Sequence, residues 1–311
     1  MCTAIHKDHL FGRTLDLECS FGESVTLTPR GCPLSFLYDN PLSRHLAFWG
    51  CAHVRDGRAF YYDGMNEAGV AIAALNFPVS AHYAPPKPSY RNLASFEVIP
   101  ALLSQCQSAE EAKDFLKKAH ITDDAAHKEL PTTPLHWMVA DLRKSFVAEP
   151  TAEELRIYDN PVGVLTNEPP FPYHMTHLSD YLSLSPIPPE NHLAPSLSLS
   201  PYSRGMGAMG LPGDGSSASR FVRAVYGREH LQWNADHKIE DFFHLMDTVA
   251  QPKGLSVTDK GEPIYTVYTD CMDLSALSYS YTTYGNRTVR SHSFRDLPLD
   301  GDTVFHVPMD S

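Results

Sequence analysis

The order of the predicted elements favours an α+β fold built from stacked layers. Strand patterns occupy both ends of the chain, two groups of helical patterns lie between them, and further strands separate the two groups. Strands and helices do not alternate one by one, as a parallel β-α-β sheet would require. A length of 311 residues is within the range of one large sheet-based domain. We therefore expect residues 1–311 to form a single domain.

Strand patterns dominate the first quarter of the chain. Residues 2–7 (CTAIHK) and 9–16 (HLFGRTLD) predict two short strands on either side of a turn at Asp8. Apolar, β-branched and aromatic residues predict four more strands, within 24–31, 45–54, 59–64 and 69–77.

The middle of the chain mixes helices with hairpins. Residues 95–106 predict a helix that Pro100 starts or bends. Residues 108–120 predict a second helix, because Ser108 and Glu111 have the spacing of a capping box and the basic residues come late. Residues 134–150 predict a hairpin that turns at 142–144, and residues 154–167 predict two more strands.

The last third begins with a segment rich in Ser, Pro and Leu, residues 184–202, which predicts a long surface loop. Two helices are predicted after it, within 217–231 and 239–250. The chain then returns to strands, within 264–274, 277–286 and 287–294.

The charge and the composition exclude several classes of partner. The formal net charge is −12, which disfavours nucleic acid and anionic membranes as partners, since both attract clustered Lys and Arg. Residues 6–9 are polar or charged, so no apolar signal sequence is evident, and no apolar run is long enough to span a bilayer. We expect a cytoplasmic protein with reduced thiols.

We expect no metal and no cofactor. The six cysteines show no CxxC spacing. His174 and His177 are one helical turn apart, but no third ligand is evident near them. The glycines of residues 205–210 (GMGAMG) follow a Pro- and Ser-rich loop and lack the lysine of a phosphate-binding loop.

Cys2 is a candidate nucleophile if Met1 is removed. Residue 2 would then carry a thiol and a free α-amine, and such an amine titrates at about 7.7–8.0, close to neutral pH. The amine could take the proton of the thiol without any histidine. The thiolate also needs a nearby cation and the amine needs an acceptor, and Arg13 and Asp16 have the right chemistry for these two roles. A strand pair over residues 2–16 would bring them back toward Cys2.

Each of these residues also has a simpler explanation. A lone terminal cysteine is usually inert, and an Arg and an Asp three residues apart usually form a solvated pair. The hypothesis therefore depends on the rest of the chain supplying the remaining parts of a site.

Five blocks of the chain belong together: MCTAI…FGRTLD at the start, DGMNEAGVAIAALNFP at 63–78, TTPLHWMVAD at 132–141, VGVLTNEP at 162–169 and GLPGDGSSASRFVR at 210–223. These blocks resemble the choloylglycine hydrolases, the family of bile salt hydrolases and penicillin V acylases. They occur in the family's order and extend over most of the chain.

The resemblance implies an αββα sandwich, the fold of N-terminal nucleophile hydrolases, with two antiparallel sheets between outer layers of helices. It implies that Cys2 is the nucleophile and that Arg13 lies beside the thiol while Asp16 holds the amine. Three further residues acquire roles from the resemblance alone. Asn76 would supply oxyanion donors, Asn167 would contact the amine and help to place the oxyanion, and Arg220 would complete the polar shell.

The same resemblance implies hydrolysis of a small-molecule amide and assembly as a homotetramer. Asn76 is typical of bile salt hydrolases, whereas penicillin acylases often carry Tyr at that position. The small, polar loop at 123–130 points the other way, because bile salt hydrolases tend to have apolar residues there. We expect glycine- or taurine-conjugated bile salts as substrates, with penicillin V as the alternative.

Two other hypotheses remain open at this stage. A chain that keeps Met1 would lack the free amine and could be an inactive relative that only binds ligands. A dipeptidase of the same superfamily also begins with a cysteine, although the LNFP block at 75–78 and the block at 210–223 count against it.

Overall fold

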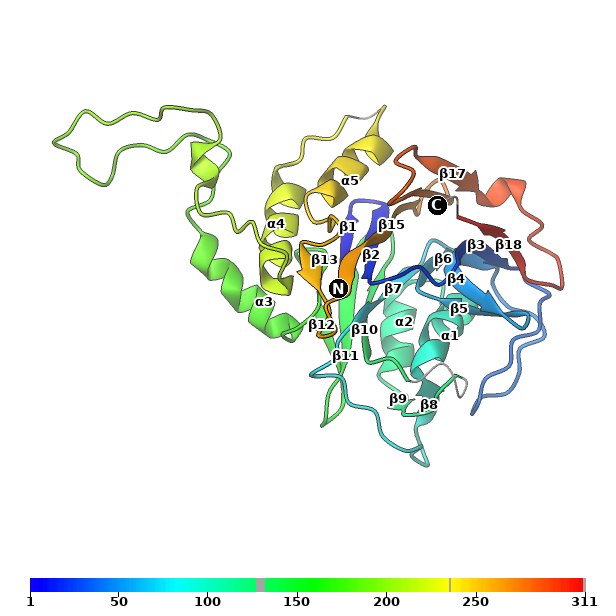
Figure 1. Ribbon diagram of the computed structural model, residues 1–311. Coiled ribbons are helices and arrows are strands. Elements are labelled where there is room, and N and C mark those ends of the chain that lie inside the picture. Colours follow the sequence, from blue (N-terminus) through cyan, green and yellow to red (C-terminus); the bar gives the residue numbers. More distant parts are fainter. Residues whose placement is uncertain (127–131, 235, 310–311) are drawn as a thin grey trace.

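The computed structural model describes residues 1–126, 132–234 and 236–309, and two antiparallel sheets form its centre (Figure 1). The first sheet carries the start of the chain in its interior, because β1 lies between β2 and β13. Across this sheet the strands are β13 (Val164–Leu165), β1 (Cys2–Lys7), β2 (Leu10–Leu17), β15 (Pro263–Asp273), β16 (Ser278–Thr283) and β17 (Arg290–Ser293), with β14 (Ser256–Val257) paired to β15.

The second sheet is larger and is built mainly from the first half of the chain. Across it the strands are β12 (Leu155–Asp159), β11 (Ser145–Pro150), β10 (Leu135–Ala140), β7 (Ala71–Asn76), β6 (Asp63–Asn66), β4 (Phe48–Arg55), β3 (Glu23–Thr28) and β18 (Phe305–Pro308), with β5 (Arg58–Tyr61) paired to β4. A short parallel pair, β8 (Arg91–Ala94) and β9 (Ala119–Thr122), lies apart from both sheets.

The two sheets pack face to face, as the alternation of side chains along β7 illustrates. Ala73 and Leu75 belong to the apolar core shared with the first sheet, where β7 contacts β1 and β2. Ile72 and Ala74 point the other way, into the core beneath the helices on the outer face. A strand that is buried on both faces needs apolar side chains at every position, which explains the run of small and aliphatic residues at 71–75.

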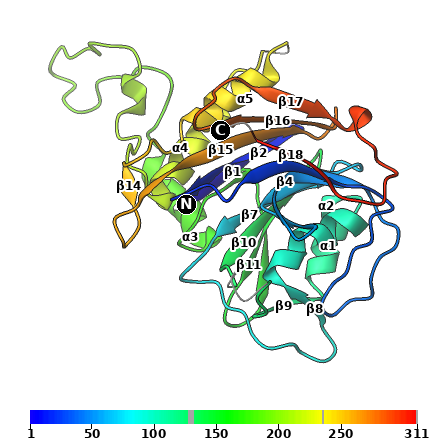
Figure 2. The ribbon, with the colours of Figure 1, turned by 45° about the vertical axis from the view of Figure 1, so that its right-hand side comes forward.

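Helices cover the outer faces of both sheets, which completes the αββα sandwich (Figure 2). The helices α1 (Val98–Gln105) and α2 (Ala109–Leu116) pack on the second sheet. The helices α4 (Ser217–His230) and α5 (Lys238–Asp247) pack on the first sheet, with α3 (Phe171–His177) beside α4. The α+β fold class is confirmed, and so are the layers that the family resemblance implied.

The predicted elements differ from the structure mainly where segments are short. The capping box of α2 is only half formed: Ser108 accepts from the Glu111 N–H, but the Glu111 carboxylate reaches the N–H of Gln107 instead of Ser108. Pro100 lies in the first turn of α1, where its missing N–H costs no hydrogen bond. The sequence did not predict α3, the parallel pair β8–β9 or the edge strand β18.

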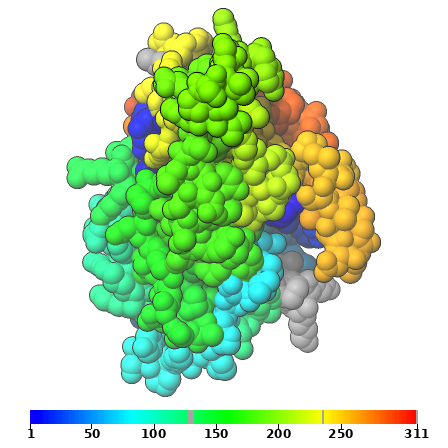
Figure 3. Space-filling model, turned by 90° about the vertical axis from the view of Figure 1, so that its left-hand side faces the viewer, coloured from blue at the N-terminus to red at the C-terminus, as the bar shows by residue number. Residues whose placement is uncertain are grey.

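The predicted surface loop is a long arm, residues 183–211, that projects from the body of the molecule (Figure 1). Its regular structure is limited to one 3₁₀ turn, Met206–Ala208. Figure 3 views the molecule from the side on which the arm projects. Within the part of the chain that the structure describes, no helix is long and apolar enough to cross a membrane.

Candidate active site

The hairpin of β1 and β2 places Cys2 and Arg13 on the same face of the first sheet. Cys2 lies opposite Leu15 and Ala4 lies opposite Arg13, so Cys2 and Arg13 are diagonal neighbours across the strand pair. This face is turned toward the second sheet, and both side chains are buried. The predicted pairing of residues 2–7 with the following strand is therefore confirmed.

Arg13 is held rigidly from the second sheet and keeps one nitrogen free. Its Nη1 donates to the backbone oxygens of Ala74 (2.7 Å) and Tyr62 (3.2 Å). Its Nη2 is buried and has no hydrogen-bond partner among the described residues. Burial alone would lower the pKa of Arg13, but the nearby thiol of Cys2 and buried acidic groups raise it overall. Arg13 is thus a fixed cation with a donor available for an anion.

Asp16 lies on the opposite face of β2 and is oriented by two hydroxyl groups. Its carboxylate accepts hydrogen bonds from Thr14 Oγ1 (3.2 Å) and Thr266 Oγ1 (2.7 Å). The pairing of β2 with β15 shifts register between Thr266 and Tyr268, and such a bulge re-aims neighbouring side chains. With Met1 present, Asp16 contacts the start of the chain through its backbone, since its oxygen accepts from the Met1 amine at 2.7 Å.

Asn167, just after β13, connects the start of the chain to two other elements. Its Oδ1 accepts from the backbone N–H of Cys2 (2.9 Å) and from Arg220 Nη2 (2.6 Å). Its Nδ2 donates to the backbone oxygen of Asn76 (2.8 Å). The nitrogen that would become the free amine of Cys2 therefore already faces the Asn167 side chain.

Arg220 is fully buried, although its place in a helix made an ordinary surface role plausible. It lies in the first turns of α4, whose N-terminus Ser216 caps by accepting from the Ser219 N–H. Its Nη1 donates to the backbone oxygen of Cys2 (2.5 Å) and to Thr3 Oγ1 (2.6 Å). Burial lowers the pKa of Arg220. These contacts fix the backbone of residues 2–3 from outside the sheet.

Asn76 ends β7 at the wall of the cavity that contains the Cys2 thiol. Among the described residues its side-chain amide has no hydrogen-bond partner, so its N–H groups are available to a ligand. The cavity has a volume of about 330 Å³. Its walls are mainly apolar: the apolar and aromatic lining residues are Leu15, Leu17, Phe21, Phe60, Tyr61, Tyr62, Ala74, Phe96, Ile99, Ala126 and Leu135.

Several residues that support Asn167 were missed by sequence reasoning. Ser217 Oγ accepts from the backbone N–H of Asn167 (2.8 Å), and His174 Nε2 lies 3.0 Å from the backbone oxygen of Asn167. Burial lowers the pKa of His174 to about 4, so this imidazole is neutral at pH 7 and can donate to that oxygen. His174 also stacks on Phe221, while His177 contacts Asp180. The two histidines thus have separate structural partners instead of a common ligand.

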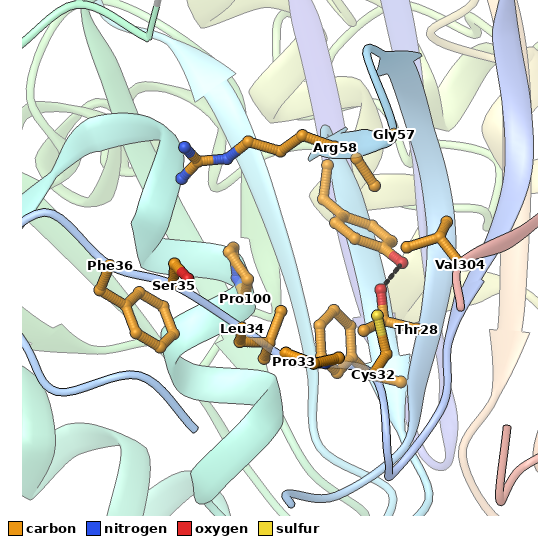
Figure 4. A pocket seen from close by; sticks show the side chains of 13 residues that line it. Thr28, Cys32, Pro33, Leu34, Ser35, Phe36, Gly57, Arg58, Pro100 and Val304 are labelled. Carbon is orange, nitrogen blue, oxygen red and sulfur yellow. Dashed lines mark hydrogen bonds between the residues drawn. The ribbon is translucent and has the colours of Figure 1, made fainter. Parts of the chain in front are cut away.

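Figure 4 shows a second, smaller cavity of about 190 Å³. Tyr61 contributes to the walls of both cavities. The Tyr61 hydroxyl is held by Thr28 Oγ1 at 2.8 Å. The smaller cavity also contains the thiol of Cys32, and the Arg58 guanidinium points away from that thiol (Figure 4). Arg58 Nη2 instead lies 3.4 Å from Glu97 Oε1. Burial raises the pKa of Cys32, so this thiol lacks the activation that a nucleophile needs.

The thiols of Cys19, Cys51, Cys106 and Cys271 also lack the activation that a nucleophile needs. All are free, and the pKa of each is raised, chiefly by burial. Cys19 is exposed, whereas Cys32, Cys51, Cys106 and Cys271 are buried. Cys2 differs from all of them because a guanidinium, two asparagines and the end of the chain surround it.

A family model described as linear amide C–N hydrolases, choloylglycine hydrolase family, matches residues 2–306. The chain belongs to this family. It is therefore a hydrolase of linear amide C–N bonds. The match begins at Cys2 and includes all six residues that the resemblance assigned to the site.

Curated relatives match over the full chain. A bile salt hydrolase/transferase of Lactiplantibacillus plantarum is 41% identical over 316 residues, which span 100% of this chain and 98% of the relative. A bile salt hydrolase/transferase of Clostridium perfringens is 35% identical over 98% of this chain and 95% of its own length.

Solved structures agree with the family assignment. A mutant conjugated bile acid hydrolase from Clostridium perfringens superposes with a TM-score of 0.93 at 33% identity, over 100% of this chain and 97% of that chain. A penicillin V acylase from Agrobacterium tumefaciens superposes with a TM-score of 0.79 at 19% identity, over 99% and 91% of the two chains. The second likeness shows the shared fold alone.

Proposed function

We propose that this enzyme cleaves the amide bond of glycine- or taurine-conjugated bile salts, with Cys2 as the nucleophile. One observation carries the proposal: the Cys2 thiol lies in a largely apolar cavity that Arg13 and Asn76 also line, and Arg13 Nη2 has no hydrogen-bond partner among the described residues. An apolar cavity suits a large apolar acyl group. The names of the relatives add the bile salt as the substrate class.

The proposed reaction begins with removal of Met1, which exposes the amine of Cys2. The amine takes the proton of the thiol, and the sulfur attacks the amide carbonyl to form a tetrahedral oxyanion. The C–N bond then breaks, the proton passes to the departing nitrogen, and a thioester remains on Cys2. Attack by water on the thioester releases the acid and restores the thiol.

The surrounding residues divide the supporting roles. Arg13 Nη2 stabilises the thiolate, because it is a fixed, buried donor that no other group in the described part of the chain engages. Asn167 Oδ1 accepts a hydrogen bond from the Cys2 nitrogen and so orients the amine. The Asn76 amide donates to the oxyanion. Asp16 orients the amine from the face of β2 opposite to Arg13. Arg220 fixes the backbone carbonyl of Cys2.

A parallel amine-release assay with glycocholate, taurocholate and penicillin V tests the substrate class. We expect turnover of at least one bile salt to exceed that of penicillin V in kcat/KM. Efficient cleavage of penicillin V with no cleavage of either bile salt would overturn the proposal in favour of the acylase alternative. The polar loop at 123–130 was the observation that favoured that alternative, and its residues 127–130 lie outside the described residues.

Asn76→Ala should lower kcat far more than it changes KM. Loss of one oxyanion donor typically costs on the order of 10²–10³ in kcat, because the interaction exists mainly in the transition state. Steady-state kinetics with the best substrate of the panel measures the effect. Asn92→Ala is the matched control, since the Asn92 side chain bonds the neighbouring loop at Lys87 and Tyr90 and does not line the cavity. A normal kcat for Asn76→Ala would remove Asn76 from the site.

We also propose that copies of this chain assemble as a homotetramer through the arm. The arm and the turn leading into it expose large apolar side chains, and such a concentration is typical of protein–protein contact surfaces. The exposed residues are Leu182, Ile187, Leu193, Leu197, Leu199, Tyr202 and Met209. Light scattering should report about four times the mass of one chain, and a monomer at micromolar concentration would contradict the assembly.

We place the enzyme in the cytoplasm. The six free cysteines support this location, because the cytoplasm keeps thiols reduced. Fractionation of the producing cells tests it, and recovery of the enzyme outside the cytoplasmic fraction would contradict it.

A further inference from the structure

Two buried carboxyl groups meet directly behind Arg13, one from each sheet. Asp63 lies on β6 of the second sheet and Asp270 lies on β15 of the first, and neither is exposed to solvent. The Tyr279 hydroxyl lies 3.2 Å from Asp63 Oδ1 and 2.9 Å from Asp270 Oδ2. A phenol has a single proton to donate. The second contact is therefore a hydrogen bond only if one of the two carboxyl groups is itself protonated.

The surroundings of the pair also favour a bound proton. Burial raises the pKa of Asp63 and raises that of Asp270 well above its usual range, and in Asp270 the charge of Asp63 raises it further. Two carboxylates in one dry site disfavour each other's ionisation. The charged and titratable groups of the packed strands that face the pair or its immediate neighbours are Arg13 of β2, Glu23 of β3, Cys51 of β4, Tyr268 of β15 and Tyr279 of β16.

Hydrogen bonds hold the pair against Arg13. Asp270 Oδ1 accepts from the backbone N–H of Arg13 at 2.7 Å. Asp63 is bonded by the Tyr268 hydroxyl and by the backbone N–H of Cys51 at 3.1 Å. Asp63, Asp270 and Tyr268 therefore join the two sheets immediately beneath the residue that faces the Cys2 thiol.

The charges balance only for one state of the pair. With one proton, the pair carries a single negative charge against the single positive charge of Arg13. With no proton or with two, the dry interior would contain an uncompensated charge, which is costly. The net charge of the cluster of Arg13, Asp63 and Asp270 thus depends on the number of protons on the two carboxyl groups. This net charge is what the Cys2 thiol faces.

We propose that Asp63 and Asp270 share one proton and together act as the counter-charge that positions Arg13 and moderates its effect on the Cys2 thiol. Both are positioning residues, because they act through Arg13 and do not touch the thiol. The inference rests on the proposed role of Cys2 in the same site.

Asn substitutions of the two aspartates, made singly and together, test the proposal. In Asp63→Asn or Asp270→Asn the remaining carboxyl group ionises, so the pair keeps its single negative charge. The pH midpoint of Cys2 alkylation by iodoacetamide should then move by less than about half a unit. The double variant removes the counter-charge, so this midpoint should fall by about one unit or more. A shift of a full unit in either folded single variant would overturn the proposal.

Infrared spectroscopy gives an independent measurement of the proton. Wild-type protein at neutral pH should show a protonated-carboxyl carbonyl band that disappears in both single variants. Tyr279→Phe keeps both carboxyl groups and should keep the band at a shifted frequency, which preserves the test if an Asn variant fails to fold. Survival of the band in either single Asn variant would contradict the shared proton. A Tyr279→Phe spectrum with the band at the wild-type frequency would also contradict it.

Asp273→Asn is the matched control, because Asp273 is on the same strand as Asp270 but its carboxylate bonds the turn at Ser275 and Ala276 and lies near His9. It should change neither the band nor the alkylation profile. Neither measurement needs a substrate. A failure of the substrate panel therefore leaves this test intact, and a failure here leaves the proposed hydrolysis standing.

Discussion

Cys2→Ala is expected to abolish amide hydrolysis while leaving the protein folded. Loss of the nucleophile in a hydrolase that uses covalent catalysis costs on the order of 10⁶ in kcat. The fold should tolerate the change, because β1 is held by its backbone pairing to β2 and by Arg220, neither of which uses the thiol. Initial rates with the best substrate and a thermal melt of the same sample measure the two effects.

Cys2→Ser and Cys19→Ser sharpen this test. Cys2→Ser should be strongly impaired, because an alcohol is a much weaker nucleophile than a thiol near neutral pH. Cys19→Ser should keep normal activity, since Cys19 is exposed and has a raised pKa. If Cys2→Ala retained even a tenth of wild-type turnover, another residue would have to perform the chemistry.

Retention of Met1 is expected to lower the activity strongly, although less than loss of the thiol does. With Met1 in place the Cys2 nitrogen is a peptide N–H that donates to Asn167, and such a nitrogen cannot accept a proton. A positioned general base contributes about 10²–10⁴-fold, so activity should fall at least by that factor. The Met1 amine donates to the backbone oxygen of Asp16, and the Asp16 N–H donates to the backbone oxygen of Met1. Met1 is therefore fixed next to Cys2.

A cleavable N-terminal fusion provides the comparison. One sample is cut so that Cys2 becomes the first residue, and the other keeps one additional residue before it. The first should be active and the second should not, while both should give the same thermal melt. Equal activity in the two samples would show that the free amine is not the base.

The sequence predicted much of the fold because its long elements have clear periodicity. The β1–β2 hairpin, the strands around β7 and the helices α4 and α5 follow alternation or helical spacing that is visible in the chain. The short pair β8–β9 and the edge strand β18 were missed, since four residues give little pattern. The helix α3 was missed because it follows Pro169 and Pro170, and consecutive prolines are typical of a turn.

The site was predictable only in part from local chemistry. Cys2, Arg13 and Asp16 are close in sequence, so a hairpin could be expected to unite them. Asn167 and Arg220 are 165 and 218 residues from Cys2, and only the family resemblance connected them to it. The pair Asp63–Asp270 was not predicted, because an Asp before a Gly is typical of a turn and Asp270 lies 207 residues away in sequence (270 − 63).

The identity of the first residue of the active enzyme tests the central claim most directly. Active protein is treated with iodoacetamide until half of its activity is lost, and its intact mass and labelled peptides are then determined by mass spectrometry. The account predicts a chain that is lighter by one methionine residue, with one label on the N-terminal Cys2 in proportion to the lost activity. Fully active protein that retains Met1, or inactivation that follows labelling of another cysteine, would contradict it.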